Sequence, residues 1–294
     1  MAVELESVIG LYAHTQALRG GIVASNRVTL NLVEYATTNR AFKPAANDLA
    51  FEVSELALVT YMLARDLGQP LVGVPIVMMR QPAFASLVCR SDSDISGPKD
   101  LEGGVIGVRS YTQTTGVWLR GIIGDEYGVD ISKLRWTTLE GAHLEAYEDP
   151  PNAARAADLE KPLLNMLLDG DVAAAVGVDG AATNPQLRTV IPEAERAEAE
   201  WTTRTGVETI NHGLVTLKSV AAANPWLKDE LIALLERAKT HTHEFANGGP
   251  YPAGQVPGKA GLEPNRKAID TLARYAHEQQ ITKHRFTVDE LYPA

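Results

Sequence analysis

The chain has 294 residues, of which 45% are hydrophobic and 22% charged, an ordinary globular composition rather than a disordered or fibrous one. A chain of this length is too long for one hydrophobic core, so two lobes are expected. The formal net charge of −10 argues against a nucleic-acid partner, because phosphates would be repelled. The longest apolar runs, such as residues 71–79, are too short to cross a bilayer, so no membrane is expected either.

The first residues contain no basic region followed by an apolar stretch, so a cytoplasmic protein is expected. Cys89 is the only cysteine, which rules out an internal disulfide. Its neighbours Leu87 and Val88 favour a buried thiol on a strand over a reactive one.

Short β-rich runs alternate with segments of helical period, which is typical of parallel α/β sheets. In chain order, the predicted strands cover residues 7–12, 28–33, 71–79, 86–90, 105–109, 135–138, 172–178 and 214–218. The predicted helices cover residues 54–67, 115–127, 162–169, 225–245 and 265–280. The fourth helix carries an apolar stripe that should pack on a sheet, formed by Leu227, Leu231, Leu234, Leu235 and Ala238. Residues 247–261, rich in Gly and Pro, are predicted to form a long loop.

Several segments are similar to one known family. They are FEVSEL (51–56), SGPKDLEGGVIGVRSYTQTTGVWLRGIIGDEYGVD (96–130), EDPPN (148–152), PLLNMLLDGDVAAAV (162–176), NPWL (224–227) and LEPNRKAID (262–270). Together they resemble the 4,5-dihydroxyphthalate decarboxylase family, enzymes related to substrate-binding proteins. The resemblance runs from about residue 12 to the C-terminus, and its most specific part is the block 96–130.

The resemblance implies a type II periplasmic-binding-protein-like α/β fold, with two lobes joined by two hinge crossings and the ligand cleft between them. Lobe one would comprise residues 1–88 and 214–294, and lobe two residues 89–213. The resemblance also implies non-oxidative decarboxylation of an aromatic carboxylic acid.

The sequence departs from the family pattern in two places. Where the family has Tyr-Asp-Arg-Thr, this chain has Tyr12, Ala13, His14 and Thr15. After the strand at 71–79, the family's Arg-His pair is absent, and the chain reads RQPAFAS from residue 80 to residue 86. These changes alter the charges that would face a diacid, so the sequence leaves open whether the substrate is 4,5-dihydroxyphthalate or another aromatic carboxylic acid.

The segment 109–115, called the 109–115 loop below, joins a predicted strand to a predicted helix. Its candidate substrate-binding residues are Arg109, Ser110, Tyr111, Thr112, Thr114 and Thr115. Ligands of open α/β sheets bind at the carboxyl ends of strands, and a helix N-terminus offers unpaired amides to an anion. The alternative is an ordinary helix start, capped by Thr114 or Thr115, with Arg109 in a surface ion pair. The Tyr111 ring could stack on a substrate or simply pack.

Two further candidates follow from predicted element ends. Glu52 precedes Ser54, the expected N-cap of the helix at 54–67, and could bind substrate hydroxyls or act as acid or base. Glu55 would lie in the first turn of that helix, where an acid is explained by the helix dipole alone. Arg80 emerges from an apolar strand and could pair with a carboxylate, or form a structural salt bridge.

Loss of CO2 from an aromatic ring requires a proton donor at the ring carbon, and a histidine suits that task. His14 lies at the end of the first predicted strand and is a catalytic candidate. The resemblance adds His212, near the second crossing, as a catalytic candidate, and His143, after a strand of lobe two, as a substrate contact.

No cofactor is expected, although the sequence leaves a divalent metal open. His241 and His243 point to different faces of a helix, so they cannot easily share one ion. Zinc-protease, P-loop, Gly-x-Ser-x-Gly and dinucleotide-binding motifs are absent from the sequence.

The leading hypothesis is a decarboxylase of a hydroxylated or related aromatic carboxylate, a lyase of aromatic compound catabolism. One alternative is a cytosolic or exported solute-binding protein or sensor that releases an aromatic or heteroaromatic acid unchanged. A third is a different lyase or hydrolase that acts on a ring acid. The expected partner is a small aromatic carboxylate, and a homodimer or higher homo-oligomer is possible.

Overall fold

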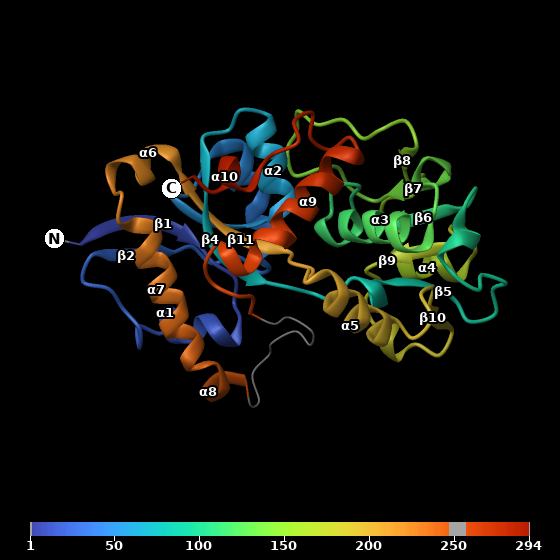
Figure 1. Ribbon diagram of the computed structural model, residues 1–294, viewed down its shortest axis with the longest axis horizontal. Helices are drawn as coiled ribbons and strands as arrows, with labels where there is room; N and C mark the ends of the chain where they lie inside the picture. Colours follow the sequence, from blue (N-terminus) through green and yellow to red (C-terminus); the bar gives the residue numbers. More distant parts are fainter. Residues whose placement is uncertain (1, 247–256, 294) are drawn as a thin grey trace. The chain divides into compact units, whose positions relative to one another are not determined.

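The computed structural model describes residues 2–246 and 257–293, and most of the loop predicted at 247–261 lies outside these ranges. The chain forms two compact units. Unit 1 contains Met1–Gln81, Ile210–Ala273 and His284–Ala294, and unit 2 contains Pro82–Thr209 and Arg274–Lys283. Each unit has one β-sheet with helices packed on it, which confirms the α/β prediction (Figure 1).

The sheet of unit 1 has the strand order β2-β1-β3-β11-β4. Its strands are β1 (Val3–Val8), β2 (Val28–Leu32), β3 (Val53–Ala57), β4 (Leu71–Met79) and β11 (His212–Leu217). β1 pairs in parallel with β2 and β3, whereas β11 is antiparallel to β3 and β4. The sheet is therefore mixed, and the prediction of wholly parallel sheets is wrong.

Helices cover the sheet of unit 1. They are α1 (Gln16–Arg19), α2 (Leu58–Asp66), α6 (Lys218–Ala223), α7 (Leu227–Thr240), α8 (Thr242–Ala246) and α10 (Val288–Leu291). The apolar stripe of α7 is buried against strand residues such as Leu5, Val53 and Leu214, which confirms the predicted packing. Figure 1 shows α7, in orange, lying against this sheet. The single helix predicted at 225–245 is in fact α7 and α8, which meet at His241.

The predicted helix at 54–67 is partly wrong. Residues Val53–Ala57 form β3, a central strand in which every residue is buried, and α2 begins only at Leu58. Polar residues at 54 and 55 suggested a capped helix start, but pairing with β1 and β11 on both sides holds them in an extended conformation.

The sheet of unit 2 has the order β10-β5-β9-β6-β7-β8. Its strands are β5 (Leu87–Arg90), β6 (Val105–Val108), β7 (Arg135–Thr138), β8 (Ala153–Arg155), β9 (Ala174–Val176) and β10 (Leu187–Thr189). Its helices are α3 (Thr114–Tyr127), α4 (Leu163–Leu168) and α5 (Ala194–Thr205). β6 is parallel to β7 and β9, and Figure 1 shows α3, in green, beside β6 and β7. Cys89 is buried in β5, as predicted.

The last long helix, α9 (Arg266–Glu278), contributes to both units. Its C-terminal part packs on α3, where the ring of Tyr275 lies 5.8 Å from that of Trp118 and fills the space beside Gly121. A Cβ atom at Gly121 would lie 2.3 Å from the Tyr275 ring, so only glycine allows this approach. The sequence placed residues 274–283 in lobe one, whereas the structure places them in unit 2.

Candidate functional site

A buried carboxylate forms the centre of a polar cluster in unit 1. Glu55 is fully buried on β3 and accepts three hydrogen bonds. The Gly10 N–H donates to Oε2 at 2.8 Å, while the Tyr12 hydroxyl and His212 Nδ1 reach Oε1 at 2.5 and 2.7 Å. Hydrogen bonds of this kind stabilise a buried negative charge, so the cluster can hold a carboxylate in the interior.

Three strands bring these residues together. Leu214 of β11 pairs with Glu55 of β3, so His212, two residues earlier, lies on the same face of the sheet as Glu55. β1 runs parallel to β3, and the turn after β1 brings Gly10 and Tyr12 to the same edge. The cluster thus occupies the carboxyl ends of β1 and β3, the usual position of ligands in α/β sheets.

The turn at residues 10–15 is held by its own hydrogen bonds. Thr15 Oγ1 donates to the Gly10 carbonyl at 2.7 Å and accepts the Tyr12 N–H at 3.0 Å. A Cβ atom at Gly10 would lie 2.4 Å from the Tyr12 ring, so glycine is required there. Burial and the Glu55 charge raise the pKa of Tyr12 well above its usual value, which keeps the hydroxyl protonated as a donor.

His212 has the geometry of a working acid or base. Its Nδ1 is bonded to Glu55, which fixes the tautomer and orients the ring, and the side chain remains 16% exposed. The ring of Phe42 packs edge-on against it at 5.0 Å. A carboxylate behind an imidazole stabilises the imidazolium form, so Nε2 can carry a proton for transfer.

His14 lies nearby but in a different state. It is buried, stacks on Tyr12 with ring centroids 4.9 Å apart, and its Nε2 bonds the Met78 carbonyl at 2.8 Å. Because a carbonyl only accepts, Nε2 carries the proton and donates it to the main chain. Burial lowers the pKa of His14 to about 4, so the ring is neutral near pH 7. The geometry therefore favours His212 over His14 as a proton donor.

The structure does not bring Glu52 into the cluster. Glu52 precedes β3, and its Oε2 accepts the Glu6 N–H at 2.6 Å. Glu55 is three positions further along the chain, a distance of about 10 Å in an extended strand. Its proposed acid or base role has no support from this position.

Arg80, in contrast, directly follows β4 beside the start of β11. The N–H of the next residue, Gln81, donates to Asn211 Oδ1 at 2.7 Å, and Asn211 precedes His212. This places the backbone of Arg80 near the histidine, as a binding role would require.

In unit 2 the 109–115 loop follows β6, as predicted, and its serine and threonine side chains are buried. Ser110 Oγ lies 3.2 Å from Thr112 Oγ1 and 3.1 Å from the Gly141 carbonyl. Helix α3 begins at Thr114, its N-cap is Gln113, and no side chain caps it, so the predicted cap by Thr114 or Thr115 is wrong. His143, two residues beyond Gly141, is buried as well.

Two residues of the loop have structural partners of their own. Arg109 forms an ion pair with Glu140, the alternative that the sequence left open. The Tyr111 ring is buried, with the guanidinium of Arg120 4.0 Å above it and the Trp136 ring edge-on at 6.3 Å. Packing, rather than an open stacking surface, accounts for Tyr111.

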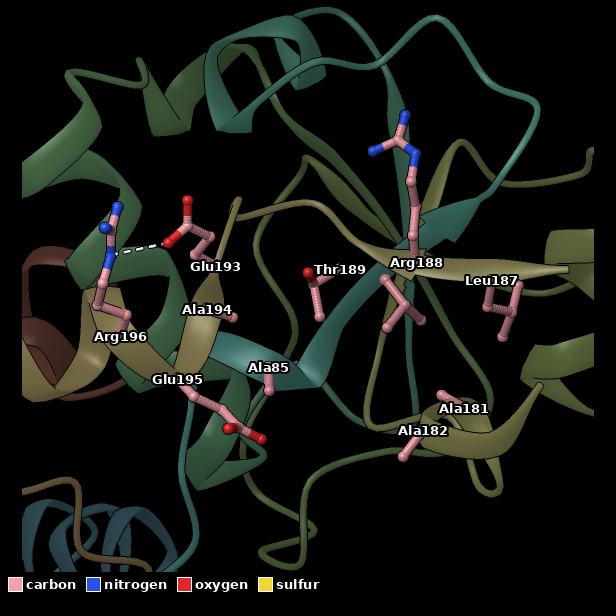
Figure 2. Close-up of a pocket in the computed structure, with 11 residues that line it drawn as sticks. Ala85, Ala181, Ala182, Leu187, Arg188, Thr189, Glu193, Ala194, Glu195 and Arg196 are labelled. Carbon is pink, nitrogen blue, oxygen red and sulfur yellow. Dashed lines mark ion pairs between the residues drawn. The ribbon is translucent and has the colours of Figure 1, made fainter. Parts of the chain in front are cut away.

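A separate pocket of about 520 Å³ lies within unit 2, and no residue predicted from the sequence lines it (Figure 2). Alanine, valine and leucine side chains form most of its walls. Figure 2 shows the ion pair of Glu193 and Arg196, with 2.8 Å between Oε2 and Nε, at the opposite end from Ala181 and Ala182. Glu193 and Arg196 neutralise each other, and the remaining charged residues of the pocket lining are Glu195 and Arg188.

Sequence reasoning missed Glu55 and Tyr12. Glu55 was assigned to a helix dipole, and the adjacent polar residues Ser54 and Glu55 interrupt the continuous apolar run that would have indicated a buried strand. Among the described residues, no group of three or more His, Cys, Asp or Glu side chains could hold a metal ion. Within the same residues, no helix is both long and apolar enough to span a membrane.

Two curated proteins are similar to this chain in sequence. One, named 4,5-dihydroxyphthalate decarboxylase, from Comamonas testosteroni, is 29% identical over 217 residues, which cover 68% of this chain and 63% of the relative. The other, of the same name, from Pseudomonas putida, is 26% identical over 175 residues, which cover 55% and 66%. The predicted resemblance is confirmed. The match to these decarboxylases spans just under two thirds of the length of each. No family model matches the chain.

Several solved structures share the fold of this chain at low sequence identity. The periplasmic aliphatic sulphonate binding protein SsuA from Escherichia coli superposes with a TM-score of 0.67 at 12% identity, covering 99% of this chain and 97% of that one. SsuA from Xanthomonas axonopodis pv. citri, bound to MOPS, gives 0.60 at 13% identity, covering 99% and 97%. A Candida albicans protein described as having the generic periplasmic binding protein fold gives 0.55 at 11% identity, covering 95% and 89%. The fold is therefore periplasmic-binding-protein-like, as predicted.

Proposed function

We propose that this protein is a carboxy-lyase that removes CO2 from a hydroxylated or related aromatic carboxylic acid, with His212 as the proton donor and Glu55 as the residue that holds it. The observation that carries the proposal is the 2.7 Å hydrogen bond between His212 Nδ1 and the fully buried Glu55 carboxylate. The similarity to two proteins named as decarboxylases supports the reaction class.

The proposed reaction begins with transfer of a proton from His212 Nε2 to the ring carbon that bears the carboxylate. A hydroxyl ortho or para to that carbon supplies the electron density, and Glu55 stabilises the imidazolium before transfer. The bond from the ring carbon to the carboxylate then breaks, its electron pair restores the aromatic ring, and CO2 leaves. His212 is left neutral and regains its proton from solvent, so one proton is consumed for each CO2 released.

Each unit, taken by itself, contains cationic or hydroxyl groups that are candidates for binding the acid. In unit 1, Arg80 leaves β4 beside the start of β11. In unit 2, Arg109 and the buried hydroxyls of the 109–115 loop are the candidates. A carboxylate held equally well before and during reaction would gain no rate, so these contacts should set affinity more than turnover.

The test is incubation with a panel of hydroxybenzoic, dihydroxyphthalic and heteroaromatic acids, with measurement of CO2 release. His212→Gln should abolish most turnover of the acid that reacts, while its affinity changes little. The matched control is His241→Gln, because His241 Nδ1 also bonds a carboxylate, Glu244 at 2.8 Å, but at an exposed position. Equal turnover by wild type and His212→Gln would remove His212 from the mechanism.

A second candidate function is that of a binding protein or sensor for such an acid without turnover. The structural similarity to sulphonate binding proteins favours it. Thermal stabilisation by an acid of the panel, with no CO2 released from any member, would support this function over the first. The cytoplasmic location expected from the sequence stays a prediction, which cell fractionation tests.

A further inference from the structure

A charged side chain in the interior of unit 2 has only neutral hydrogen-bond partners among the described residues. Arg120 of α3 is fully buried, and its Nε donates to Gln279 Oε1 at 2.6 Å while Nη2 donates to the Tyr111 carbonyl at 2.5 Å. The rings of Tyr111 and Trp136 lie 4.0 and 4.8 Å from the guanidinium carbon. Nη1 has no hydrogen-bond partner among the described residues. An arginine buried in this way is costly unless something negative meets it.

Three other buried polar atoms near Arg120 also lack a partner among the described residues. They are Trp136 Nε1, the Tyr147 hydroxyl and Asp149 Oδ1. Trp136 is in contact with the guanidinium, and Tyr147 and Asp149 are close enough to interact with its charge. More than nine in ten buried polar groups in folded proteins are paired. The guanidinium nitrogen and the three unpaired atoms near it indicate a site that binds a ligand.

The hydrogen-bonding chemistry of these groups determines the charge of the ligand that they can bind. Arg120 and Trp136 offer N–H donors, the Tyr147 hydroxyl can donate or accept, and Asp149 Oδ1 offers an acceptor. Asp149 Oδ2 lies 3.7 Å from Arg155 Nη2, so Asp149 already has a cationic partner other than Arg120. Arg120 is therefore left with an unpaired Nη1 donor in the interior, and an anion with oxygen acceptors fits the excess of donors.

We propose that Arg120, Trp136 and Tyr147 bind a planar oxyanion of carboxylate type in the interior of unit 2. The guanidinium fork matches the two oxygens of such a group, and the indole and phenol donors complete its coordination. Gly116 borders Nη1, and a Cβ atom there would lie in ordinary van der Waals contact with it, at 3.5 Å. Two sources share this chemistry: a free small anion such as bicarbonate or formate, and the carboxylate end of an organic acid. The second source rests on the proposed function, whereas the first does not.

The test is a binding measurement on the full chain rather than an activity assay, so that its result is independent of turnover. Chloride is replaced stepwise by formate, bicarbonate or benzoate at constant ionic strength, and thermal unfolding is followed. Wild type should be stabilised in a saturable manner by at least one of the three. Stabilisation by formate or bicarbonate but not benzoate identifies the free anion, and stabilisation by benzoate identifies the carboxylate of an organic acid.

The decisive variant is Tyr147→Phe, which removes one donor and keeps the ring. It should weaken the affinity for the stabilising anion about tenfold, while its stability in chloride alone is not reduced, since no protein partner is lost. Tyr127→Phe in the same unit is the control and should bind as wild type does. Arg120→Met should abolish binding, and circular dichroism would first establish that it folds. Absence of saturable stabilisation by all three anions, or equal affinity in Tyr147→Phe, would overturn the proposal.

Discussion

Replacement of Glu55 by glutamine tests the centre of the unit 1 cluster. Glutamine has the same shape but offers one acceptor oxygen and one NH2 group in place of two acceptor oxygens. The Tyr12 hydroxyl and His212 Nδ1 both bond Oε1, while the Gly10 N–H bonds Oε2. The amide can keep its oxygen toward Tyr12 and His212 only if its NH2 group faces the Gly10 N–H, so at least one buried donor loses its acceptor.

The expected cost follows from these contacts. An unsatisfied buried donor lowers the free energy of unfolding by about 1–3 kcal/mol, so Glu55→Gln should be less stable by about 2 kcal/mol. The imidazolium of His212 also loses a charged hydrogen bond worth about 1.5–3 kcal/mol. Because about 1.4 kcal/mol corresponds to a factor of ten in rate, kcat should fall by roughly ten- to a hundredfold.

The assay measures CO2 release from the acid of the panel that reacts, and gives kcat and KM between about pH 5 and pH 9. Glu55→Gln should have a lower kcat throughout this range, because the His212 ring has lost the carboxylate that orients it. The control is Glu244→Gln, which breaks the exposed pair with His241. A folded Glu55→Gln protein with the kcat of wild type would refute the assignment of Glu55 as the residue that holds His212.

The remaining predictions concern stability and binding. Since burial lowers the pKa of His14 from 6.5 to about 4, the unfolded chain binds more protons between these values, and stability present above about pH 6.5 is lost as the pH falls through about 4. Denaturant unfolding should show a loss of about 3 kcal/mol in this window that is absent from His14→Gln. Gly121→Ala should destabilise the protein by about 1–3 kcal/mol because its Cβ would lie 2.3 Å from the Tyr275 ring, whereas Gly124→Ala on the same helix, with ordinary contacts of 3.4 Å, should be neutral or stabilising. Arg109→Ala should raise KM with little change in kcat, and a lower kcat at unchanged KM would contradict its assignment to binding.

The α/β class, the family resemblance and most strand positions were predictable from the sequence, because buried strands are nearly continuous apolar runs such as residues 71–79. β3 was not predicted as a strand, because its polar residues interrupt the apolar run. Ser54 and Glu55 are typical of a helix start, and only pairing with strands distant in sequence makes the segment extended. Similarly, no local pattern indicates that Tyr275, on a helix assigned to lobe one, would pack against Gly121.

The candidate histidines were found from the chemistry that decarboxylation needs, but the sequence could not rank them. The ranking depends on partners supplied by other segments: a main-chain carbonyl at Met78 for His14, and the buried Glu55 carboxylate for His212. Glu55 itself was overlooked because its function depends on burial, which a strongly polar local sequence does not suggest.

The division of the chain within α9 has a practical consequence for dissecting this protein. A fragment of residues 82–209 contains every strand of the second sheet but lacks Tyr275 and Gln279, which cover α3 and hold Arg120. Such a fragment would expose an apolar groove along α3 and leave a guanidinium without its amide acceptor. The exposed groove should make the fragment poorly soluble, and a synthetic peptide of residues 266–283 added in trans should restore its solubility. Unit 2 would then consist of one continuous segment and a short C-terminal peptide that can be supplied separately.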